Sequence, residues 1–560
     1  MKTTKNNGRI EITKNCGVKK MSFRTNDPNA DEQLTLFGGL TELTEREKKH
    51  LKKSWAESFR NNIYPAIKEE RFAVLYSNNP ATRPNTPINF ILGAMIIGTI
   101  QGLSEEELIE SILFDIRYQY ALHTINSQEQ PVNEHSFRRF RQRVLRYKEE
   151  TGIDLIDEEF KHLTTVMGKF MKLNPEIKRM DSMMVASHCK SMSRLELIYQ
   201  VNANAIHLLH KNGRDDLIPS ELKHYLESDD LNKVIYYSKS DELSSRLIKV
   251  ISELELLLNA MEEKEWAGFS EYQMLCRVKE EQCSQNENGK TIPKENKEIS
   301  TNSLQNPSDP DATFRRKAGK SHKGYVANIT ETIGENGDSL ITGISVEQNT
   351  HSDIEFCREY LESRPENAEH ETLITDGAYG SEENFKLAEK KNVELVATAL
   401  TGVLPDQIYA DFKMNEEGNC IIKCPAGHAP IHQNYNNKTE MCRAVMAAEC
   451  CANCPYHDKC HPKKQKNSFV VKVSRKKIHR AKYMQKISTE EYIKISRLRN
   501  AVEGIPSVLR RKFRIDEIPV FGLMRTTFYI QIKVIAYNFG KFFKSCRRAQ
   551  LSCTPTQIAG

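Results

Sequence analysis

Two apolar, strand-like segments far apart in the sequence each carry a single aspartate. Asp181 lies among three methionines and a valine, and Asp376 follows Leu-Ile-Thr and precedes Gly-Ala. A carboxylate inside an apolar strand is expensive to bury unless it is protonated, paired or bound to a metal. Each acid alone could be an ordinary turn, surface or helix-capping residue. Together they predict two strands whose carboxylates belong to a common site.

A third acid, Glu503, lies in a predicted helix near the C-terminus. At 100° per residue, Arg499, Glu503 and Arg510 fall within about 40° of one another on one helix face. Gly504 and Pro506 interrupt the helical pattern directly after the glutamate. A shared helix face with Glu503 is therefore better supported for Arg499 than for Arg510. A structural salt bridge among these charges is the alternative to a functional site.

Two strand aspartates and a helical glutamate form the ligand set that a pair of Mg²⁺ ions needs for phosphodiester chemistry. Hard cations bind a few carboxylates and keep room for water and phosphate. Two such ions can clamp the attacking and leaving oxygens of an in-line displacement. We therefore predict that Asp181, Asp376 and Glu503 are catalytic and hold two Mg²⁺ (or Mn²⁺) ions.

These residues and their surroundings resemble the bacterial insertion-sequence transposases of the DDE type. The block from Ser308 to Tyr325 looks like the one that leads into the family's second strand. The stretch from Pro87 to Val144 looks like the helical N-terminal domain of one branch. The family often has a Tyr three residues before the Arg and a Lys seven residues after the catalytic Glu. Those positions hold Ser496 and Arg510 here.

The resemblance implies a ribonuclease H-like α/β fold, with a mixed sheet, a helical N-terminal domain, a helical insertion and a cysteine-rich insertion. It also implies phosphodiester hydrolysis at each transposon end, followed by transfer of the freed 3′-hydroxyl into target DNA. The implied partners are double-stranded DNA, as terminal inverted repeats and target, and a second copy of the chain on that DNA. A nuclease without strand transfer, or a zinc-containing DNA-binding protein derived from a transposase, is the alternative.

The order of the predicted elements is strand, hairpin, helix and strand, which suits a mixed sheet flanked by helices. Segment 284–309 is rich in Asn, Lys, Ser and Pro, and we predict a mobile linker there because it has few apolar residues. The predicted regions are a flexible leader 1–45, a helical N-terminal domain 46–170 that binds DNA ends, a first catalytic part 171–400 with a helical insertion 190–280, a cysteine-rich insertion 401–473, C-terminal catalytic helices 474–545 and a tail 546–560.

Local signals support the helices and the location of the protein. Ser104 with Glu107, and Ser488 with Glu491, are capping-box signatures that predict helix starts. The apolar run Ile91 to Ile100 is too short to span a bilayer and predicts a buried helix. The N-terminus is polar, with no apolar signal-peptide core. We expect a soluble, intracellular protein, and the resemblance implies a bacterial cytoplasm with association to the nucleoid.

Seven of the 14 cysteines lie between Cys420 and Cys460. In an intracellular chain, cysteines paired two or three residues apart favour zinc over disulfides. Tetrahedral zinc needs four converging ligands, which two short knuckles provide. We predict a structural zinc site, with unliganded thiols or a redox role as alternatives. The favoured ligands are Cys424, Cys451, Cys454 and Cys460, and the possible substitutes are Cys420, Cys442, Cys450, His457 and His461.

Basic residues gather in local clusters, although the net charge of the chain is only +6. Any one cluster could be a solvated face, but together they favour phosphate contacts that position a duplex without reading bases. A predicted helix with Phe137 and Phe140 could enter a major groove, although such aromatic pairs are more often core. The predicted DNA-binding residues are Arg138, Arg139, Arg141, Lys320, Lys323, Arg499 and Arg510.

Overall fold

The structure is a computed structural model that describes residues 21–25 and 39–552, except 80, 128–129, 134, 237–241, 288, 318, 335–336, 401 and 403. Most of the predicted leader and tail therefore lies outside the described residues. The chain divides into two compact units. Unit 1 comprises Met1–Met167 with Gln531–Gly560, and unit 2 comprises Gly168–Ile530.

Unit 1 is helical and has α3 as its central apolar element. Most residues of α3 are buried, and the helix ends at Gly102, whose φ of +73° is favourable for glycine. The predicted capping box at the start of α4 is confirmed, because Ser104 and Glu107 bond reciprocally. The helices are α1 (Glu45–Lys52), α2 (Trp55–Asn62), α3 (Ile88–Gln101), α4 (Glu105–Phe114), α5 (Ile116–Ala121), α6 (Ser136–Thr151) and α7 (Leu155–Phe170), with the part of α20 (Leu523–Ser552) that starts at Gln531.

Within the described part of the chain, no single helix has the length and apolar composition to cross a membrane, and α3 with α4 passes that test only as a pair bent by 108°.

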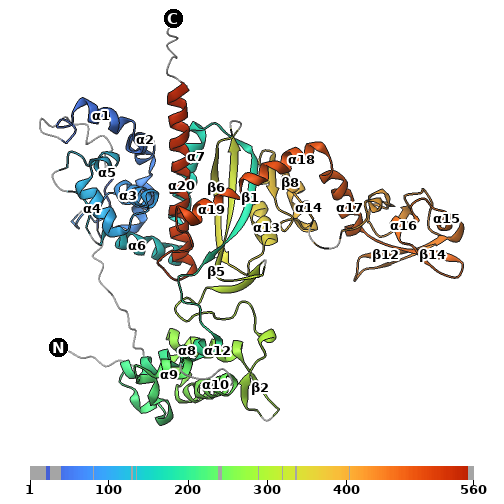
Figure 1. Cartoon of the computed structure of the whole chain (residues 1–560), viewed down its shortest axis with the longest axis horizontal. Helices are drawn as coiled ribbons and strands as arrows, with labels where there is room; N and C mark the ends of the chain where they lie inside the picture. Colours follow the sequence, from blue (N-terminus) through green and yellow to red (C-terminus); the bar gives the residue numbers. More distant parts are fainter. Residues whose placement is uncertain are drawn as a thin grey trace, which may run out of the picture. The chain divides into compact units, whose positions relative to one another are not determined.

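Unit 2 contains a mixed sheet in which β5 is antiparallel to its neighbours and β1, β7 and β8 are parallel (Figure 1). The strand order is β6-β5-β1-β7-β8, with β4 paired to the first residues of β5. This arrangement agrees with the predicted mixed α/β sheet. The strands are β1 (Leu173–Ala186), β4 (Thr313–Lys317), β5 (Lys320–Gly334), β6 (Ser339–Gln348), β7 (Glu371–Thr375) and β8 (Val393–Ala397).

The two faces of this sheet are covered by different helices. On one face, Met180 and Met184 of β1 pack with Phe356 of α13 (Asp353–Ser363) and Ala388 of α14 (Glu382–Lys390). On the other face, strand residues of β7 and β8 pack with tyrosines of α17 (Arg475–Ile487) and α18 (Glu490–Arg497). Side chains alternate along a strand, so residues 179 and 181 point to the second face.

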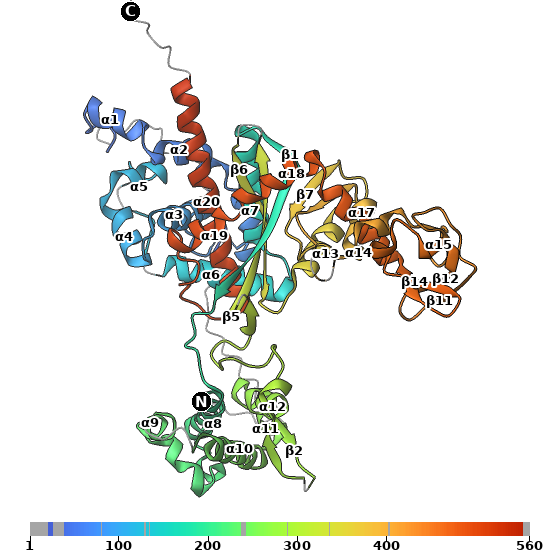
Figure 2. The ribbon, with the colours of Figure 1, turned by 45° about the vertical axis from the view of Figure 1, so that its right-hand side comes forward.

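The segment from α8 to α12 has a hydrophobic core of its own, and Figure 2 shows α8, α10 and α12 together. The predicted long helical stretch is divided into separate helices: α8 (Arg194–Lys211), α9 (Asp230–Ile235), α10 (Leu243–Ala260), α11 (Glu263–Trp266) and α12 (Ser270–Gln282).

Segment 284–309 differs from the mobile linker that its composition suggested. It contributes to the hairpin of β2 (Cys283–Gln285) with β3 (Thr291–Pro293), and Leu304 is 1% exposed in the core of the helical insertion. Asp309 is fully buried and accepts hydrogen bonds from Ser187 Oγ at 2.6 Å and Gly522 N at 3.1 Å. Hydrogen bonds to a buried polar side chain therefore help to hold this segment in the fold.

The cysteine-rich region folds around a four-stranded sheet of order β11-β12-β14-β13 with a small core. All described cysteines are free thiols. The elements are β9 (Lys413–Met414), β10 (Ile421–Lys423), β11 (His432–Asn436), β12 (Met441–Ala447), α15 (Ala448–Ala452), α16 (His457–Cys460), β13 (Lys463–Lys464) and β14 (Ser468–Ser474).

Candidate active site

Asp181 and Asp376 lie next to each other because of the register between β1 and β7. The parallel pairing places Arg179 opposite Ile374, so Asp376, one residue past the end of β7, follows at the level of Asp181. A Cβ at residue 377 would lie 2.6 Å from the carbonyl oxygen of Ala399, so only glycine allows this turn to pass so close to the chain beyond β8. The predicted meeting of two strand aspartates is present in the structure.

Glu503 and Arg499 come from a chain of short helices, whereas the sequence predicted one helix that is interrupted only after Glu503. Arg499 lies in η9 (Leu498–Ala501), and Glu503 immediately precedes α19 (Gly504–Arg511). The helix before them starts at Thr489, whose side chain accepts from Tyr492 N, so the capping box predicted at Ser488 is wrong. Gly504 and Pro506 lie in the first turn of α19, where a proline ring is tolerated, so the chain is interrupted between η9 and α19.

The guanidinium group of Arg499 lies among all three predicted acids. Its Nη1 is 2.9 Å from Glu503 Oε1, and its Nη2 is 3.5 Å from Asp181 Oδ1 and 4.0 Å from Asp376 Oδ2. The side chains of Arg499 and Asp181 are largely buried, whereas that of Glu503 is 63% exposed. The structure thus gathers the three acids around one cation.

Burial and like charge act together on Asp181. Burial raises the pKa of its carboxyl group, and the nearby carboxylate of Asp376 raises it further. The positive charge of Arg499 and a hydrogen bond from Ser182 N oppose this shift. A positive partner therefore favours the ionised form of Asp181 at this site.

The carboxylate oxygens fit a hard divalent cation by their chemistry. Three acids approach one positive group from three separate elements, and oxygen ligands of this kind suit Mg²⁺ or Mn²⁺. Across the described ranges, however, no three His, Cys, Asp or Glu side chains converge closely enough to hold a metal ion. At this site Arg499 lies between the acids, so closer convergence would require its guanidinium to move.

Arg179 connects the strand that carries Asp181 to the turn that carries Arg499. It is almost fully buried, and two of its guanidinium nitrogens lie 2.6 Å from Oε2 of Glu331, its cross-strand partner on β5. Its Nη1 also donates to the carbonyl oxygen of Leu498 at 2.6 Å. Arg179 was not predicted as a site residue, although its position two residues before Asp181 on a strand was a signal that both share a face.

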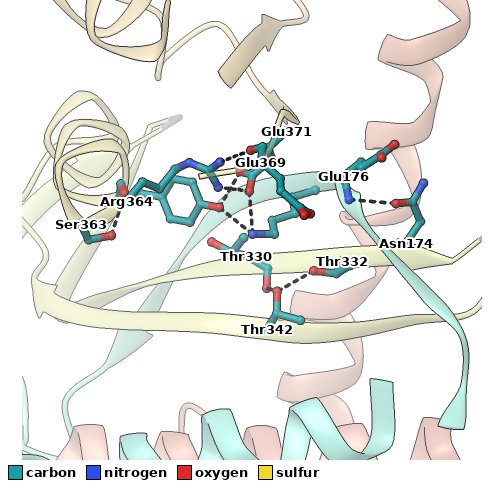
Figure 3. Close-up of polar contacts among 11 residues, drawn as sticks. Asn174, Glu176, Thr330, Thr332, Thr342, Ser363, Arg364, Glu369 and Glu371 are labelled. Carbon is teal, nitrogen blue, oxygen red and sulfur yellow. Dashed lines mark hydrogen bonds and ion pairs between the residues drawn. The ribbon is translucent and has the colours of Figure 1, made fainter. Parts of the chain in front are cut away.

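A buried network around Glu371 fixes β7 against β1 and α13. Figure 3 shows the carboxylate of Glu371 facing Arg364, with which it forms an ion pair. Lys178 Nζ lies 2.7 Å from Glu371 Oε2, and Tyr360 OH donates to Glu371 Oε1 at 2.6 Å. Because Glu371 begins the strand that ends just before Asp376, this network helps to set the relation of Asp376 to Asp181.

The other predicted DNA-binding residues of unit 2 do not join the three acids. Arg510 donates to the carbonyl oxygen of Met184 at 2.8 Å and forms an ion pair with Asp516 at 3.0 Å. Lys323 is half-buried and donates to the carbonyl oxygen of Met192 at 2.9 Å, and burial lowers its pKa. Lys320 is exposed at the start of β5.

The predicted basic helix of unit 1 is α6. Phe137 and Phe140 are fully buried, so they belong to the core and cannot enter a groove. Arg138 and Arg139 are exposed at its first turn. Arg141 forms an ion pair with Glu105.

The four favoured cysteines line a common cavity of about 20 Å³. Burial raises the pKa of Cys460 to about 12, and the charges of Cys454, Cys424 and Cys451 add to this shift, so the four thiols are neighbours. Of the possible substitutes, Cys450 and His457 also line the cavity. Cys442 instead lies near Cys420 and bonds Gln433 Oε1 at 3.5 Å. The thiols are nevertheless not converged as a metal site within the described residues.

Two segments of the chain match known protein families. Residues 423–543 match the family "Transposase DDE domain", and residues 48–143 match the family "Transposase domain (DUF772)". The first segment includes Arg499 and Glu503, whereas Asp181 and Asp376 precede it. The second segment includes Arg138, Arg139, Arg141 and Arg143 of α6 and ends before Arg146. No curated protein and no solved structure matches the chain.

Proposed function

We propose that this chain, two segments of which match transposase families, is an insertion-sequence transposase of the DDE type that cuts DNA at the ends of its element and joins them to a target. The observation that carries the proposal is the meeting of Asp181, Asp376 and Glu503 around Arg499. The strand order and directions of the mixed sheet fit the ribonuclease H-like fold that a DDE domain implies.

The proposed reaction has two in-line steps at phosphorus. A water oxygen forms a bond to the phosphorus at the element end, the bond to the 3′ oxygen breaks, and the departing oxygen takes a proton. The freed 3′-hydroxyl then attacks a phosphodiester of the target, and the bond to another 3′ oxygen breaks. Asp181, Asp376 and Glu503 would hold two divalent cations, Mg²⁺ or Mn²⁺, which would supply positive charge to the attacking and leaving oxygens.

The side chains around the acids have positioning roles in this proposal. Asp181 and Asp376 stand on the sheet, which fixes their separation, while Glu503 stands on a more exposed turn that can adjust. Arg499 balances their charge and can turn to a DNA phosphate, for which a guanidinium is well suited. We propose that Lys320, Lys323 and Arg510 add backbone contacts, the last two after breaking their bonds within the chain.

The cysteine-rich region has a supporting structural role in this proposal. Cys424, Cys451, Cys454 and Cys460 would hold one zinc ion, since four neighbouring thiols around a cavity of about 20 Å³ suit a tetrahedral site. The remaining elements of the proposal follow from the resemblance: terminal inverted repeats and target DNA as partners, a homodimer on paired ends, and a place in the bacterial cytoplasm on the nucleoid.

The test uses a duplex that carries the inverted repeat next to the gene. Asp181→Asn and Asp376→Asn should each abolish Mg²⁺-dependent cleavage while end binding remains, because an amide is a poor ligand for Mg²⁺. Glu503→Gln should do the same, and Glu491→Gln, an exposed control on α18, should cut normally. Wild-type cleavage by either aspartate variant would refute the assignment. Pre-cleaved ends then show whether the protein joins strands or only cuts.

A further inference from the structure

Unit 1 contains a cavity of about 950 Å³ beside the start of α6. Its walls come from the loop between Tyr76 and Pro87, the segment around residues 130–133 and the first two turns of α6. The cavity lies wholly within unit 1, far in sequence from the three acids.

The lining of this cavity is positively charged. Arg83, Arg138, Arg139 and Arg143 all line it, and no Asp or Glu is among its described lining residues. None of the four forms an ion pair with a carboxylate in the described ranges; Arg143 lies over the ring of Tyr76, 4.8 Å from its centroid. Four guanidinium groups without carboxylate partners attract an anion, and their fork geometry suits phosphate oxygens.

The backbone of α6 adds to this positive field. The helix has 16 residues, and no described side chain caps its first turn. Free N–H groups and the helix dipole at such an end favour an anion. The first turn carries Arg138 and Arg139, so the start of the helix and two of the arginines line the same cavity.

The cavity also separates the basic residues of α6 into two kinds. Arg141 forms an ion pair with Glu105, and Arg146 is exposed on the same helix but does not line the cavity. The DNA-binding residues predicted on this helix were Arg138, Arg139 and Arg141, and neither Arg83 nor Arg143 was among the predicted residues. The structure therefore selects a different set of arginines as available for a ligand.

We propose that the Arg83, Arg138, Arg139 and Arg143 cavity binds the phosphate backbone of duplex DNA, and this proposal rests on the transposase function proposed above. Apolar walls such as Pro84 and Pro131 can contact sugars between phosphates. Guanidinium groups directed at phosphates position a duplex without reading its sequence. The cavity thus holds the DNA of an element end, while sequence is recognised elsewhere.

The test measures binding of the full-length protein to two labelled duplexes, one with the inverted repeat and one scrambled, at several salt concentrations. In the double variant that carries Arg138→Gln and Arg139→Gln, the slope of log affinity against log salt should become shallower by about 2 units. Each lost phosphate contact removes about 0.9 units of slope. The change should be equal on both duplexes. Arg146→Gln is the matched control and should leave the slope unchanged.

Several outcomes would overturn the proposal. These are an unchanged slope in the double variant, an equal change in Arg146→Gln, or a loss confined to the inverted-repeat duplex, which would mean base reading. If inorganic phosphate raises the melting temperature of the wild type but not of the double variant, and DNA binding is unaffected, the cavity is a site for free phosphate only.

The same preparations distinguish failure of this inference from failure of the proposed function. Cleavage that depends on Mg²⁺ and on Asp376, with an unchanged slope in the double variant, would reject only the cavity. A shallower slope without any metal-dependent cleavage would reject only the catalytic assignment. An unchanged melting temperature of the double variant confirms that it folds, because exposed substitutions usually alter stability by less than about 0.5 kcal/mol.

Discussion

Replacing Arg499 by alanine removes the cation from among three carboxylates and leaves their negative charges facing one another. The guanidinium of Arg499 is 2.9 Å from Glu503, 3.5 Å from Asp181 and 4.0 Å from Asp376, and an alanine side chain reaches none of these groups. If these acids hold divalent cations, the same change also removes the guanidinium group that competes with those cations for the carboxylates. Arg499→Ala should therefore lower stability without metal and increase the stabilisation that metal provides.

The magnitude follows from how far each pair is exposed. The pair with Glu503 is an exposed i,i+4 contact, and such pairs contribute about 0.3–0.5 kcal/mol. Asp376 is farther away and one-third exposed, so its pair contributes less than about 1 kcal/mol. Asp181 is mostly buried, and removing its partner approaches the lower end of the roughly 3–5 kcal/mol seen for buried pairs. We expect a loss of about 3 kcal/mol in total.

The assay is thermal unfolding of the wild type and of Arg499→Ala in a chelator and in excess Mg²⁺. In a unit of this size, each kcal/mol corresponds to about 1–2 °C, so the variant should melt about 3–6 °C lower in the chelator. Mg²⁺ at about 100 times its dissociation constant adds about 2.7 kcal/mol and should recover most of that difference. Arg497→Ala, an exposed residue of α18, is the control and should behave as the wild type.

The pH dependence gives the same prediction a second check. The pKa of Asp181 is raised in the folded state, so its contribution to stability is present at low pH and is lost as pH rises through that pKa. Arg499 lowers this pKa, and its removal raises the value further. The stability difference between the variant and the wild type should thus be largest at neutral pH and shrink in acid. Equal Mg²⁺ responses in both proteins, or a difference independent of pH, would refute the charge-balancing role.

Two further predictions concern parts that support the site. Glu371→Gln should leave Lys178 and Arg364 without their buried carboxylate partner and lower the stability by several kcal/mol. It should also reduce the cleavage rate, because β7 would be misplaced. Thermal unfolding and cleavage rates test this prediction, and an unaltered melting temperature would contradict it. Cys454→Ser should reduce zinc content from about one ion per chain and lower the melting temperature, because zinc-binding energy is folding energy in such modules. Cys442→Ser, outside the cavity, should keep its zinc, and equal zinc in both variants would reject the ligand set.

Much of the sheet could be predicted from the sequence because its information is local. Apolar runs define β1 and β7, and an acid in each run identifies where the two strands meet. The four favoured cysteines line one cavity, and short spacings constrain where their thiols can lie. Their separation from Cys420 and Cys442, however, depends on how the strands of that region pair, which spacing does not encode.

The failures have a common physical cause. Segment 284–309 looked too polar to fold, yet Asp309 is buried because Ser187 and the backbone of Gly522 donate to it from distant parts of the chain. Composition measures how much apolar surface a segment offers, but it does not count hydrogen bonds from elsewhere that make a buried polar group tolerable. The same limit explains why composition did not reveal that Arg141 pairs with Glu105.

The position of Arg499 shows how a distant segment can be fixed at a site without any local signal. Arg179 is held by Glu331 within the sheet, and it reaches across to the carbonyl oxygen of Leu498, the residue before Arg499. Strand alternation places Arg179 and Asp181 on one face, so the anchor and the acid move together. The helix face predicted from the sequence joins Arg499 to Glu503 and Arg510 alone. In the folded chain a buried arginine of β1 also binds the backbone of that segment directly before Arg499.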